Sequence, residues 1–351
     1  MQRAHAARRS GTVAIGRQLD RIESQALRRE RQCGRRRKVK TDGPSPKGQR
    51  RRAGRRSSAR PRSAAAATRR GNPGIAPTAH YTAQAWVRDG FPNADLFDTW
   101  TGRALYGLSE LATTVARPLL PDVLRHAQEY LFIRHHVYEE RLRQLAPDFV
   151  LEIGAGLSPR GLTVARARPE MVYVEADLPH MVEEKRRRLQ RTTLPPNYHL
   201  ITIDLLGKGL ALPVTPAAGQ RVLAITEGVT DYLSMEEKTV AWNNLSSFLR
   251  ACGGGHYLCE IHPVSQHADF PWTAQFAMRA IGTLVGGLSF DGRLFERPED
   301  ALAALRRCGF DAARVLDADR LNRSRHRPPM QHCHWLLVEA SVGAHTDKAE
   351  A

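Results

Sequence analysis

Short apolar runs alternate with amphipathic segments through the second half of the chain. Seven runs have the length and residue types of buried strands: residues 149–154, 171–177, 198–205, 222–228, 256–262, 312–318 and 334–340. The intervening segments predict helices around residues 159–168, 179–191, 234–250, 270–285 and 297–308. Regular alternation of strand and helix predicts a mostly parallel sheet with helices on both faces. Because little chain separates the last two runs, we expect a hairpin at the sheet edge and one reversed strand.

The segment before the first strand, residues 80–147, is predicted to be helical. Apolar residues recur there every three to four positions after Pro121, a suitable helix start: Leu124, Ala127, Leu131, Val137 and Leu142. The helix after the fourth strand is expected to open with a capping box between Ser234 and Glu237. The predicted organisation is therefore a tail over 1–75, a helical cap over 80–147, an α/β domain over 148–342 and a disordered end over 343–351.

Charge separates the tail from the rest of the chain. The protein has 53 Lys/Arg and 36 Asp/Glu, of which residues 1–75 hold 23 and 4. This segment has few aromatic or β-branched residues, so it is predicted to be disordered. Three interpretations stay open: a solvated tail from an upstream start codon, an arginine-rich tether for nucleic acid, and a targeting peptide, although an amphipathic pattern is missing.

Cysteine usage and hydropathy indicate a reducing cytoplasm. The five cysteines are scattered and form no CxxC pair: Cys33, Cys252, Cys259, Cys308 and Cys333. No apolar run has the length of a membrane span, and no secretory signal is visible. His332 and His334 flank Cys333, but in a strand the two histidines would lie on the face opposite the cysteine. We therefore expect no metal site.

The first strand runs directly into a glycine turn, in the stretch FVLEIGAGLSPRG. In doubly wound sheets ligands bind at the carboxyl ends of the strands, so Gly154, Ala155 and Gly156 mark the first candidate site. A dinucleotide fingerprint requires a third glycine where this chain has Pro159. A phosphate-binding P-loop requires a G-K-[ST] sequence, which is missing. The turn therefore favours a ligand without a pyrophosphate.

Acidic residues stand in or near the ends of four successive strands: Glu152, Glu175, Asp177, Asp204 and Glu227. A carboxylate about 20 residues beyond a glycine loop can accept hydrogen bonds from a ribose. Together these carboxylates predict a rim for a cationic ligand that carries a ribose and an adenine amino group. S-adenosylmethionine is such a ligand. The alternative is that these residues are helix caps or solvated turn residues.

Four stretches in this order carry a family resemblance: LEIGAGLSPRG, YVEADLP followed by Lys185, IDLL, and ITEGVTDYL. They resemble the motifs of the leucine carboxyl methyltransferase family, which includes O-methyltransferases similar to the tetracenomycin polyketide enzyme. The resemblance covers residues 80–340, is strongest over 149–233 and includes none of residues 1–75. It implies a class I methyltransferase-like fold: α/β, doubly wound, with a mostly parallel seven-stranded sheet and an N-terminal helical cap. It also implies S-adenosylmethionine as methyl donor.

The resemblance implies roles for individual residues. Gly154 would let the donor approach the backbone, and Asp177 would hold its ribose. Asp204 with Leu205 would frame the adenine, and Glu227 would lie near the methionine end. Arg160 occupies the place of the family's loop arginine, and Arg134, or alternatively Arg141, would pair with the donor carboxylate. The loop departs from the family at Ser158, because LSPR stands where many members have LDTR.

Methyl transfer is an in-line displacement, so the protein mainly positions the acceptor, a small molecule in this prediction. The resemblance implies a carboxylate acceptor, which is already ionised at neutral pH and needs no base; a phenol is the alternative and would benefit from one. His262 is the best-placed base, and Tyr232 could orient the acceptor. Four apolar side chains could line the acceptor pocket, although residues at helical spacing more often belong to the core: Trp272, Phe276, Met278 and Phe290.

Three other functions remain open. An RNA-modifying methyltransferase would use the basic tail as its phosphate tether. A non-catalytic protein would keep the donor site without turnover. A nicotinamide dehydrogenase is disfavoured by Pro159 and by the acidic rim. The sequence predicts no membrane partner and no particular oligomeric state.

Overall fold

The computed structural model describes residues 75–116, 123–267, 294–322 and 335–343. The Arg-rich tail, the helix expected at 270–285 and the C-terminal end lie outside these residues, apart from Ile75 and Gly343 at the margins. Among the described helices, none is long and apolar enough to cross a membrane.

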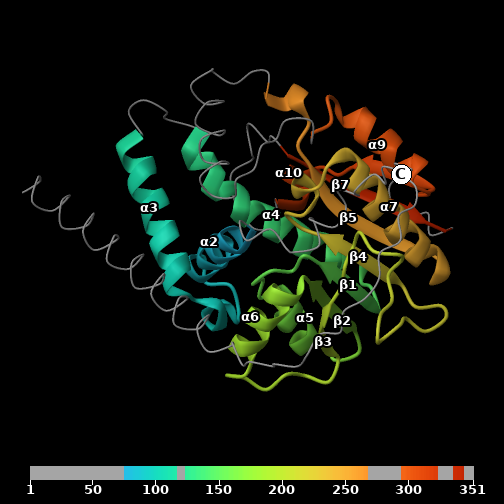
Figure 1. Cartoon of the computed structure of the whole chain (residues 1–351), viewed down its shortest axis with the longest axis horizontal. Coiled ribbons are helices and arrows are strands. Elements are labelled where there is room, and N and C mark those ends of the chain that lie inside the picture. The colour runs from blue at the N-terminus through green and yellow to red at the C-terminus, as the bar shows by residue number, and fades with distance from the viewer. Residues whose placement is uncertain (1–74, 117–122, 268–293, 323–334, 344–351) are drawn as a thin grey trace, which may run out of the picture. The chain divides into compact units, whose positions relative to one another are not determined.

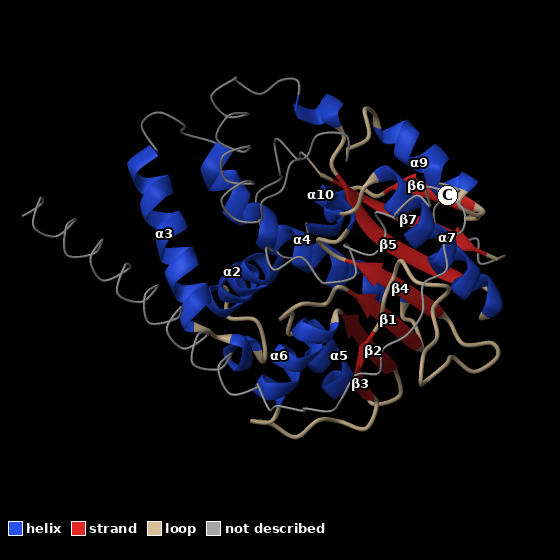
Figure 2. Cartoon of the chain, in the orientation of Figure 1, coloured by secondary structure: helices blue, strands red, loops and turns tan. Residues whose placement is uncertain are grey.

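A seven-stranded sheet runs through the described chain, with helices packed on both sides of it (Figure 1 and Figure 2). Its strand order is β3-β2-β1-β4-β5-β7-β6, and β7 alone runs antiparallel to its neighbours. The strands are β1 (Phe149–Ile153), β2 (Val172–Asp177), β3 (Tyr198–Thr202), β4 (Val222–Thr226), β5 (Gly255–Ile261), β6 (Ala312–Val315) and β7 (Leu336–Val342). Each predicted strand is therefore present, and the single reversed strand is confirmed.

The edge of the sheet differs from the prediction in one detail. β6 and β7 pair antiparallel, as expected, but a short helix, α10 (Ala318–Asn322), follows β6. The strand predicted over 312–318 ends at Val315 because Asp317 caps this helix, its Oδ1 accepting a hydrogen bond from the Arg320 N–H at 2.9 Å. The connection is thus longer than a tight hairpin.

The helices begin where the sequence offers capping signals. α7 opens with the predicted capping box: the Ser234 hydroxyl accepts from the Glu237 N–H, and the Glu237 carboxylate accepts from the Ser234 N–H. α6 has Pro179 in its first turn, where a missing N–H costs nothing. The other elements are α2 (Ile75–Arg88), η2 (Ala94–Phe97), α3 (Trp100–Ala116), α4 (Val123–Leu145), α5 (Arg160–Ala167), α6 (Pro179–Leu189), η3 (Thr230–Tyr232), α7 (Met235–Ala251), η4 (Val264–His267) and α9 (Pro298–Arg307).

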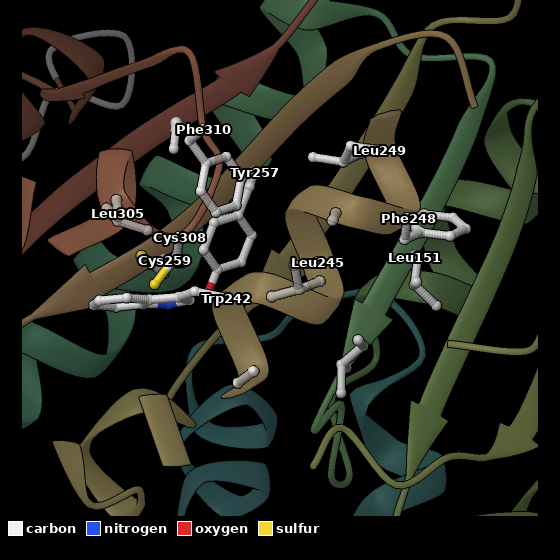
Figure 3. Packing of buried hydrophobic residues seen from close by; sticks show 14 of the residues in the cluster. Leu151, Trp242, Leu245, Phe248, Leu249, Tyr257, Cys259, Leu305, Cys308 and Phe310 are labelled. Atoms are coloured by element: carbon white, nitrogen blue, oxygen red, sulfur yellow. The ribbon is translucent and has the colours of Figure 1, made fainter. Parts of the chain in front are cut away.

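Two apolar cores form on the two faces of the sheet. α7 and α9 cover one face, where Trp242 and Leu245 of α7 belong to the same apolar cluster as Leu151 of β1 (Figure 3). α2, α4, α5 and α6 cover the other, where Val137 and Leu162 belong to the same cluster as alternate strand residues such as Val150 of β1 and Tyr173 of β2. The central strands are buried on both faces, which explains their continuous apolar runs.

The face under α4, α5 and α6 also carries four buried glutamates, one on each of four strands. Each stands two positions after an apolar residue of that face and so points the same way: Glu152, Glu175, Glu260 and Glu339. The covering helices supply cations to all four: α5 to Glu152, α6 to Glu175, and α4 to both Glu260 and Glu339, the last of which Arg141 contacts through two hydrogen bonds. Burial of a carboxylate is costly unless it is paired, so these contacts fix how the helices sit on the sheet.

One glycine allows the close approach of α5 to β2. A Cβ atom built on Gly161 would lie 2.3 Å from Glu175 Oε1, and the Gly161 N–H donates to the same oxygen at 3.2 Å. The Glu175 carboxylate has no room to move, because Lys185 Nζ lies 2.5 Å and Tyr198 Oη 2.6 Å from Oε2. Gly161 thus provides the helix–strand contact that dinucleotide sites obtain from a third glycine at the place of Pro159.

Gly161→Ala is therefore expected to lower the free energy of unfolding by about 1–3 kcal/mol, since an added methyl overpacks a filled site. Chemical denaturation measures the change. Gly107→Ala in α3 is the matched control: its Cβ would meet nothing within 4 Å, so the helix should gain up to about 1 kcal/mol. Equal stability of the two variants would contradict the packing argument.

Candidate active site

β1 and β4 are neighbours in the middle of the sheet. From β1 the chain adds β2 and β3 towards one edge, and from β4 it adds β5 towards the other, so the direction of strand addition changes between β1 and β4. Ligands of doubly wound sheets bind at such a switch point, beyond the carboxyl ends of the strands. Going along this edge from β3 to β5, the chain places Asp204, Asp177, the turn at 154–156, Glu227 and His262 just at or after the strand ends. The structure therefore brings three of the predicted rim residues to a single edge: Asp177, Asp204 and Glu227.

The glycine turn is fixed by backbone hydrogen bonds and by one carboxylate. Gly154 and Gly156 both have positive φ, 73° and 52°. The Gly154 N–H donates to the Ala176 carbonyl at 2.8 Å, which ties the turn to β2. A Cβ on Gly154 would come within 2.3 Å of Val229 Cγ2, so the turn also requires glycine for the close approach of the chain after β4. Ala155, between the two glycines, is buried.

Asp177 binds the glycine turn directly. Its Oδ2 accepts from the Gly156 N–H and its Oδ1 from the Leu178 N–H, each at 2.7 Å. An ionised carboxylate has about four acceptor positions, so two remain after these bonds. Burial raises the pKa of Asp177 above its ordinary value, although both N–H groups favour the charged form.

A buried ion network lies beneath the rim, with Arg160 at its centre. Arg160 is fully buried, and its Nη1 lies 2.9 Å from Glu152 Oε1. Its Nη2 contacts Glu227 and lies 2.7 Å from Nδ1 of His135 on α4. Arg134 completes the network with its Nε 2.9 Å from Glu227 Oε1. Arg134 Nη1 also lies 3.8 Å from Glu260 Oε1, so two arginines face three carboxyl groups.

The same contacts decide the protonation of these carboxyls. Burial alone would raise the pKa of Glu227, but Arg160 and Arg134 outweigh it and hold the pKa well below the ordinary value. Glu152 differs: burial raises its pKa against the pull of Arg160, while Tyr173 donates to its Oε2 at 2.5 Å. Glu227 is therefore a firmly ionised group at the rim, already neutralised by its arginines.

Two predicted rim residues are engaged inside the protein. Glu152 contacts Arg160 and Tyr173 beneath the rim, and Glu175 contacts Lys185, Tyr198 and Gly161. Lys185 also donates from Nζ to the Ser158 carbonyl at 2.7 Å, so the Glu175 pair holds the far end of the glycine turn. Both glutamates face the covering helices rather than the open edge of the sheet.

Asp204 and Leu205 follow β3. Asp204 is exposed, and its Oδ1 accepts from the Leu206 N–H at 3.0 Å, forming a local turn. Leu205 is buried in the core under α7, and its carbonyl accepts from Asn244 Nδ2 at 2.8 Å. This turn is thus held rigidly to α7 beside the carboxyl end of β2.

His262 forms an ion pair that the sequence did not indicate. It directly follows β5, and its Nδ1 lies 2.6 Å from Oδ2 of Asp231 in η3. Burial alone would lower the pKa of His262, but Asp231 outweighs burial and raises it above the ordinary value of 6.5. Tyr232 is next in η3, and burial raises its pKa. The chain thus brings a carboxylate-oriented histidine and a phenol to the ends of β4 and β5.

Several predicted residues lie elsewhere. Arg141, the alternative partner for the donor carboxylate, is bound to Glu339 far from the glycine turn along α4, whereas Arg134 reaches the rim. The four apolar pocket candidates lie outside the described residues: Trp272, Phe276, Met278 and Phe290. The same holds for the tripeptide His332–Cys333–His334.

Comparison with protein families gives one match. The model of the family described as leucine carboxyl methyltransferase matches residues 92–245. The match covers less than half of the chain, so the leucine carboxyl methyltransferase family is what this part of the chain resembles. The predicted resemblance is confirmed over residues 92–245, a shorter segment than the predicted 80–340, and the match ends within α7. This match supports the predicted S-adenosylmethionine-dependent methyltransferase chemistry, and the predicted class I methyltransferase-like fold agrees with the observed sheet.

Comparison with solved structures returned, among others, a complex with SAH and two proteins that their titles describe as methyltransferases. PigF with SAH is 17% identical over 56% of this chain and 50% of PigF, with a TM-score of 0.41. SibL, an S-adenosylmethionine-dependent methyltransferase in apo form, is 16% identical over 63% and 58% of the two chains, with a TM-score of 0.42. Human N-acetylserotonin methyltransferase with SAM is 14% identical over 77% and 66%, with a TM-score of 0.42. The chain spans about half the length of the first of these. A search of curated protein sequences gave no match.

Sequence reasoning missed three residues of the site region. Asp231 stands inside the quoted motif ITEGVTDYL, but its pairing with His262 requires the neighbouring ends of β4 and β5. His135 follows Arg134 directly and contacts Arg160. Glu260 stands two residues before His262, and its carboxylate accepts from Tyr138 of α4 and from the Gly228 N–H. An acidic residue inside an apolar strand was the only signal for the last of these.

Proposed function

We propose that this chain is an S-adenosylmethionine-dependent O-methyltransferase that acts on a small molecule. The observation that carries the proposal is the Asp177 carboxylate, which clamps the glycine turn at the end of β2 and keeps two acceptor positions. Those positions suit the two hydroxyls of a ribose. A carboxylate also disfavours a phosphate at this place, in agreement with a donor that has none.

The other donor contacts follow from the edge of the sheet. The backbone of Gly154–Gly156 would border the ribose and methionine, and the turn at Asp204 and Leu205 would border the adenine. Arg134 reaches the rim from α4 and would face the donor carboxylate, while Glu227 keeps that arginine in place. We assign Glu152, Glu175 and Arg160 a supporting role beneath the donor, since their polar atoms face one another or the covering helices.

For the acceptor, the His262–Asp231 pair favours an ionisable hydroxyl of the phenol type. A carboxylic acid is ionised at neutral pH and needs no base, so a carboxylate acceptor would give the pair no chemical task. A phenol, with a pKa of about 10, must lose its proton as the new bond forms. Asp231 binds Nδ1 of His262, which leaves Nε2 to accept that proton.

The mechanism then assigns separate tasks to the chain's residues. The donor supplies a methyl group on a positively charged sulfur. The protein holds the acceptor oxygen in line with that methyl and takes its proton at His262 Nε2, while Asp231 stabilises the imidazolium. Tyr232, beside Asp231, orients the acceptor. Orientation of this kind supplies up to about 7–11 kcal/mol in the best intramolecular reactions.

Transfer of a labelled methyl group tests this function. The full chain is incubated with methyl-labelled S-adenosylmethionine and separate panels of phenols, aromatic carboxylic acids and RNA. We expect label in phenols. Label confined to carboxylic acids would refute the role of His262, and label in RNA would favour the tail-tethered alternative. Donor binding without transfer to any panel would support the non-catalytic alternative.

His262→Asn is expected to lower kcat/KM for a phenol by about 100-fold or more, the usual contribution of a general base. The base must be neutral, so the wild-type rate should rise with pH through a pKa above 6.5, because Asp231 raises it. Asp231→Asn removes that effect and should move the rising limb to lower pH. If the pH–rate profile is the same in the wild type and in both variants, the His262–Asp231 pair has no catalytic role.

We place the enzyme in the reducing cytoplasm. The three described cysteines carry free thiols: Cys252, Cys259 and Cys308. Cys259 and Cys308 are buried and Cys252 is partly buried, and burial raises the pKa of each thiol, most strongly that of Cys259. Unpaired, unreactive thiols are usual in this compartment.

A further inference from the structure

Glu260 is a fully buried glutamate to which the proposed mechanism gives no task. It stands in β5, two residues before the proposed base His262. Like the other three glutamates on this face of the sheet, it lies near a cation of a covering helix. It differs from them because two of its hydrogen bonds lead to the chain that follows β4, where Asp231 lies. Glu260 therefore adjoins the proposed acceptor site.

These two hydrogen bonds tie the end of β4 to the end of β5. The Gly228 N–H donates to Oε1 of the Glu260 carboxylate, and the Thr230 hydroxyl donates to the Glu260 carbonyl at 2.7 Å. Asp231 follows Thr230 directly in the chain. The contact between Asp231 Oδ2 and His262 Nδ1, at 2.6 Å, thus joins the same two stretches of chain that Glu260 holds together.

Helix α4 fixes the Glu260 carboxylate from another side. Tyr138 donates its hydroxyl to Oε2, and Arg134 Nη1 lies 3.8 Å from Oε1. Burial and the nearby Glu260 raise the pKa of Tyr138 well above its ordinary value, so the phenol keeps its proton and stays a donor. Burial also raises the pKa of Glu260, whereas Arg134 and the Tyr138 hydroxyl favour the charged form. An ionised carboxylate accepts on both oxygens and serves all these partners at once.

Four charged groups from four elements lie around His262. Asp231 of η3 and Glu260 of β5 are acidic, whereas Arg134 of α4 and Lys238 of α7 are basic. Burial lowers the pKa of His262, Asp231 and Glu260 raise it, and Arg134 lowers it. Lys238 also favours the ionised form of Asp231. Glu260 is therefore the second carboxylate that stabilises a protonated imidazole at this place.

We propose that Glu260 is a positioning residue for methyl transfer: it joins the end of β5 to the chain after β4, so that Asp231 meets His262, and its charge stabilises the imidazolium formed there. The inference rests on the proposed function. In that step the acceptor oxygen forms a bond to the methyl carbon, the bond from that carbon to sulfur breaks with its electron pair left on sulfur, and the hydroxyl proton moves to His262 Nε2. Glu260 acts on the step through Asp231 and the imidazole.

Glu260→Gln tests the charge while keeping the shape of the side chain. The amide oxygen can still accept from the Gly228 N–H. The amide nitrogen can donate to Tyr138, whose hydroxyl then donates to the Thr226 carbonyl, 3.3 Å away. The fold and the position of the chain after β4 should therefore be retained, and far-ultraviolet circular dichroism checks the fold.

The His262 pKa is expected to fall in Glu260→Gln, by less than in Asp231→Asn, because Asp231 contacts the ring directly. Imidazole NMR measures this pKa in the full chain without substrate, and the His262 signal is assigned by its loss in His262→Asn. An unchanged His262 pKa in a folded Glu260→Gln protein would overturn the proposal.

Glu339→Gln is the matched control. Glu339 is also a buried strand glutamate paired with an arginine of α4. It lies opposite Leu258 in the sheet, four residues or about 13 Å of strand before His262. Its replacement removes a comparable charge and should leave the His262 pKa in place. An equal fall in both variants would indicate general loosening of the fold and would also overturn the role of Glu260.

Turnover of a phenol separates this inference from the proposed function. In Glu260→Gln the rising limb of the pH–rate profile should move to lower pH together with the His262 pKa. Glu260→Leu also loses the bond to Gly228 and should lower kcat by about 100-fold, the usual cost of a displaced catalytic group. A limb that stays in place while the His262 pKa falls would overturn the role in transfer. If no phenol is methylated, the proposed function fails, while the His262 pKa still decides whether Glu260 supports the imidazolium.

Discussion

Arg160→Met is expected to destabilise the protein by about 3–5 kcal/mol, the largest stability effect that we predict for a single substitution. Arg160 is fully buried and contacts β1 through Glu152, the end of β4 through Glu227 and α4 through His135. Methionine fills a similar length but carries no charge. The variant therefore leaves two buried carboxylates without their main partner, and removing one member of a buried pair costs far more than the pair contributes.

Chemical denaturation at several pH values measures this effect. In the wild type, Glu227 has a lowered pKa, so its contribution to stability is present above the unfolded pKa and disappears as the pH falls through the folded one. In the variant the same carboxyl is buried without Arg160, its pKa should rise, and stability should fall as pH increases. The difference between variant and wild type should therefore shrink in acid.

Arg143→Met is the matched control for Arg160→Met. Arg143 is exposed on α4 and pairs only with Glu140, three positions earlier. Its replacement should change stability by about 0.5 kcal/mol or less. If both variants unfolded at the same denaturant concentration, Arg160 would have no special structural role, and the supporting network beneath the rim would need another explanation.

The apolar runs were sufficient to predict the strands, because buried central strands need continuous apolar residues. The runs at 149–154 and 222–228 became β1 and β4, within one or two residues of their predicted ends. The order of the strands has no such local signal. β7 inserts between β5 and β6, and that choice depends on packing of the whole sheet.

Acidic residues inside strands were harder to interpret. Glu152 and Asp177 both follow an apolar run, but Glu152 precedes the glycine turn by two residues, or about 7 Å of strand. That displacement places it under α5, against Arg160, while Asp177 reaches the edge. A single sequence gives the position of a residue along its strand. It does not give the cation that a covering helix brings to it.

The same reasoning explains why the structural roles of Gly161 and Asp231 could not be predicted from the sequence. Gly161 is necessary only because Glu175 lies directly above it, and Asp231 matters only because β5 ends beside η3. Both contacts join elements that are separated in sequence. Motif order, in contrast, survives in the chain itself, so the family and its donor were predictable from the quoted stretches.

Asp177→Ala is expected to weaken binding of S-adenosylhomocysteine by about 100-fold or more, the largest effect on a ligand that we predict. Hydrogen bonds to a charged acceptor contribute about 1.5–3 kcal/mol each, and a ribose would make two to this carboxylate. The substitution also removes the acceptor for the Gly156 N–H, so the glycine turn loses its anchor. Titration calorimetry on the full chain measures the affinity, with NADH as the ligand that should not bind.

Two further variants separate ribose binding from turn geometry. Asp177→Asn keeps one oxygen for the Gly156 N–H and should lose less affinity than Asp177→Ala, because only the charge and one acceptor are gone. Asp204→Ala should have a smaller effect, since Asp204 is exposed and its oxygen serves a local turn. If Asp177→Ala folds and binds S-adenosylhomocysteine like the wild type, Asp177 does not bind the ribose. The donor site defined by the glycine turn and this carboxylate would then be refuted.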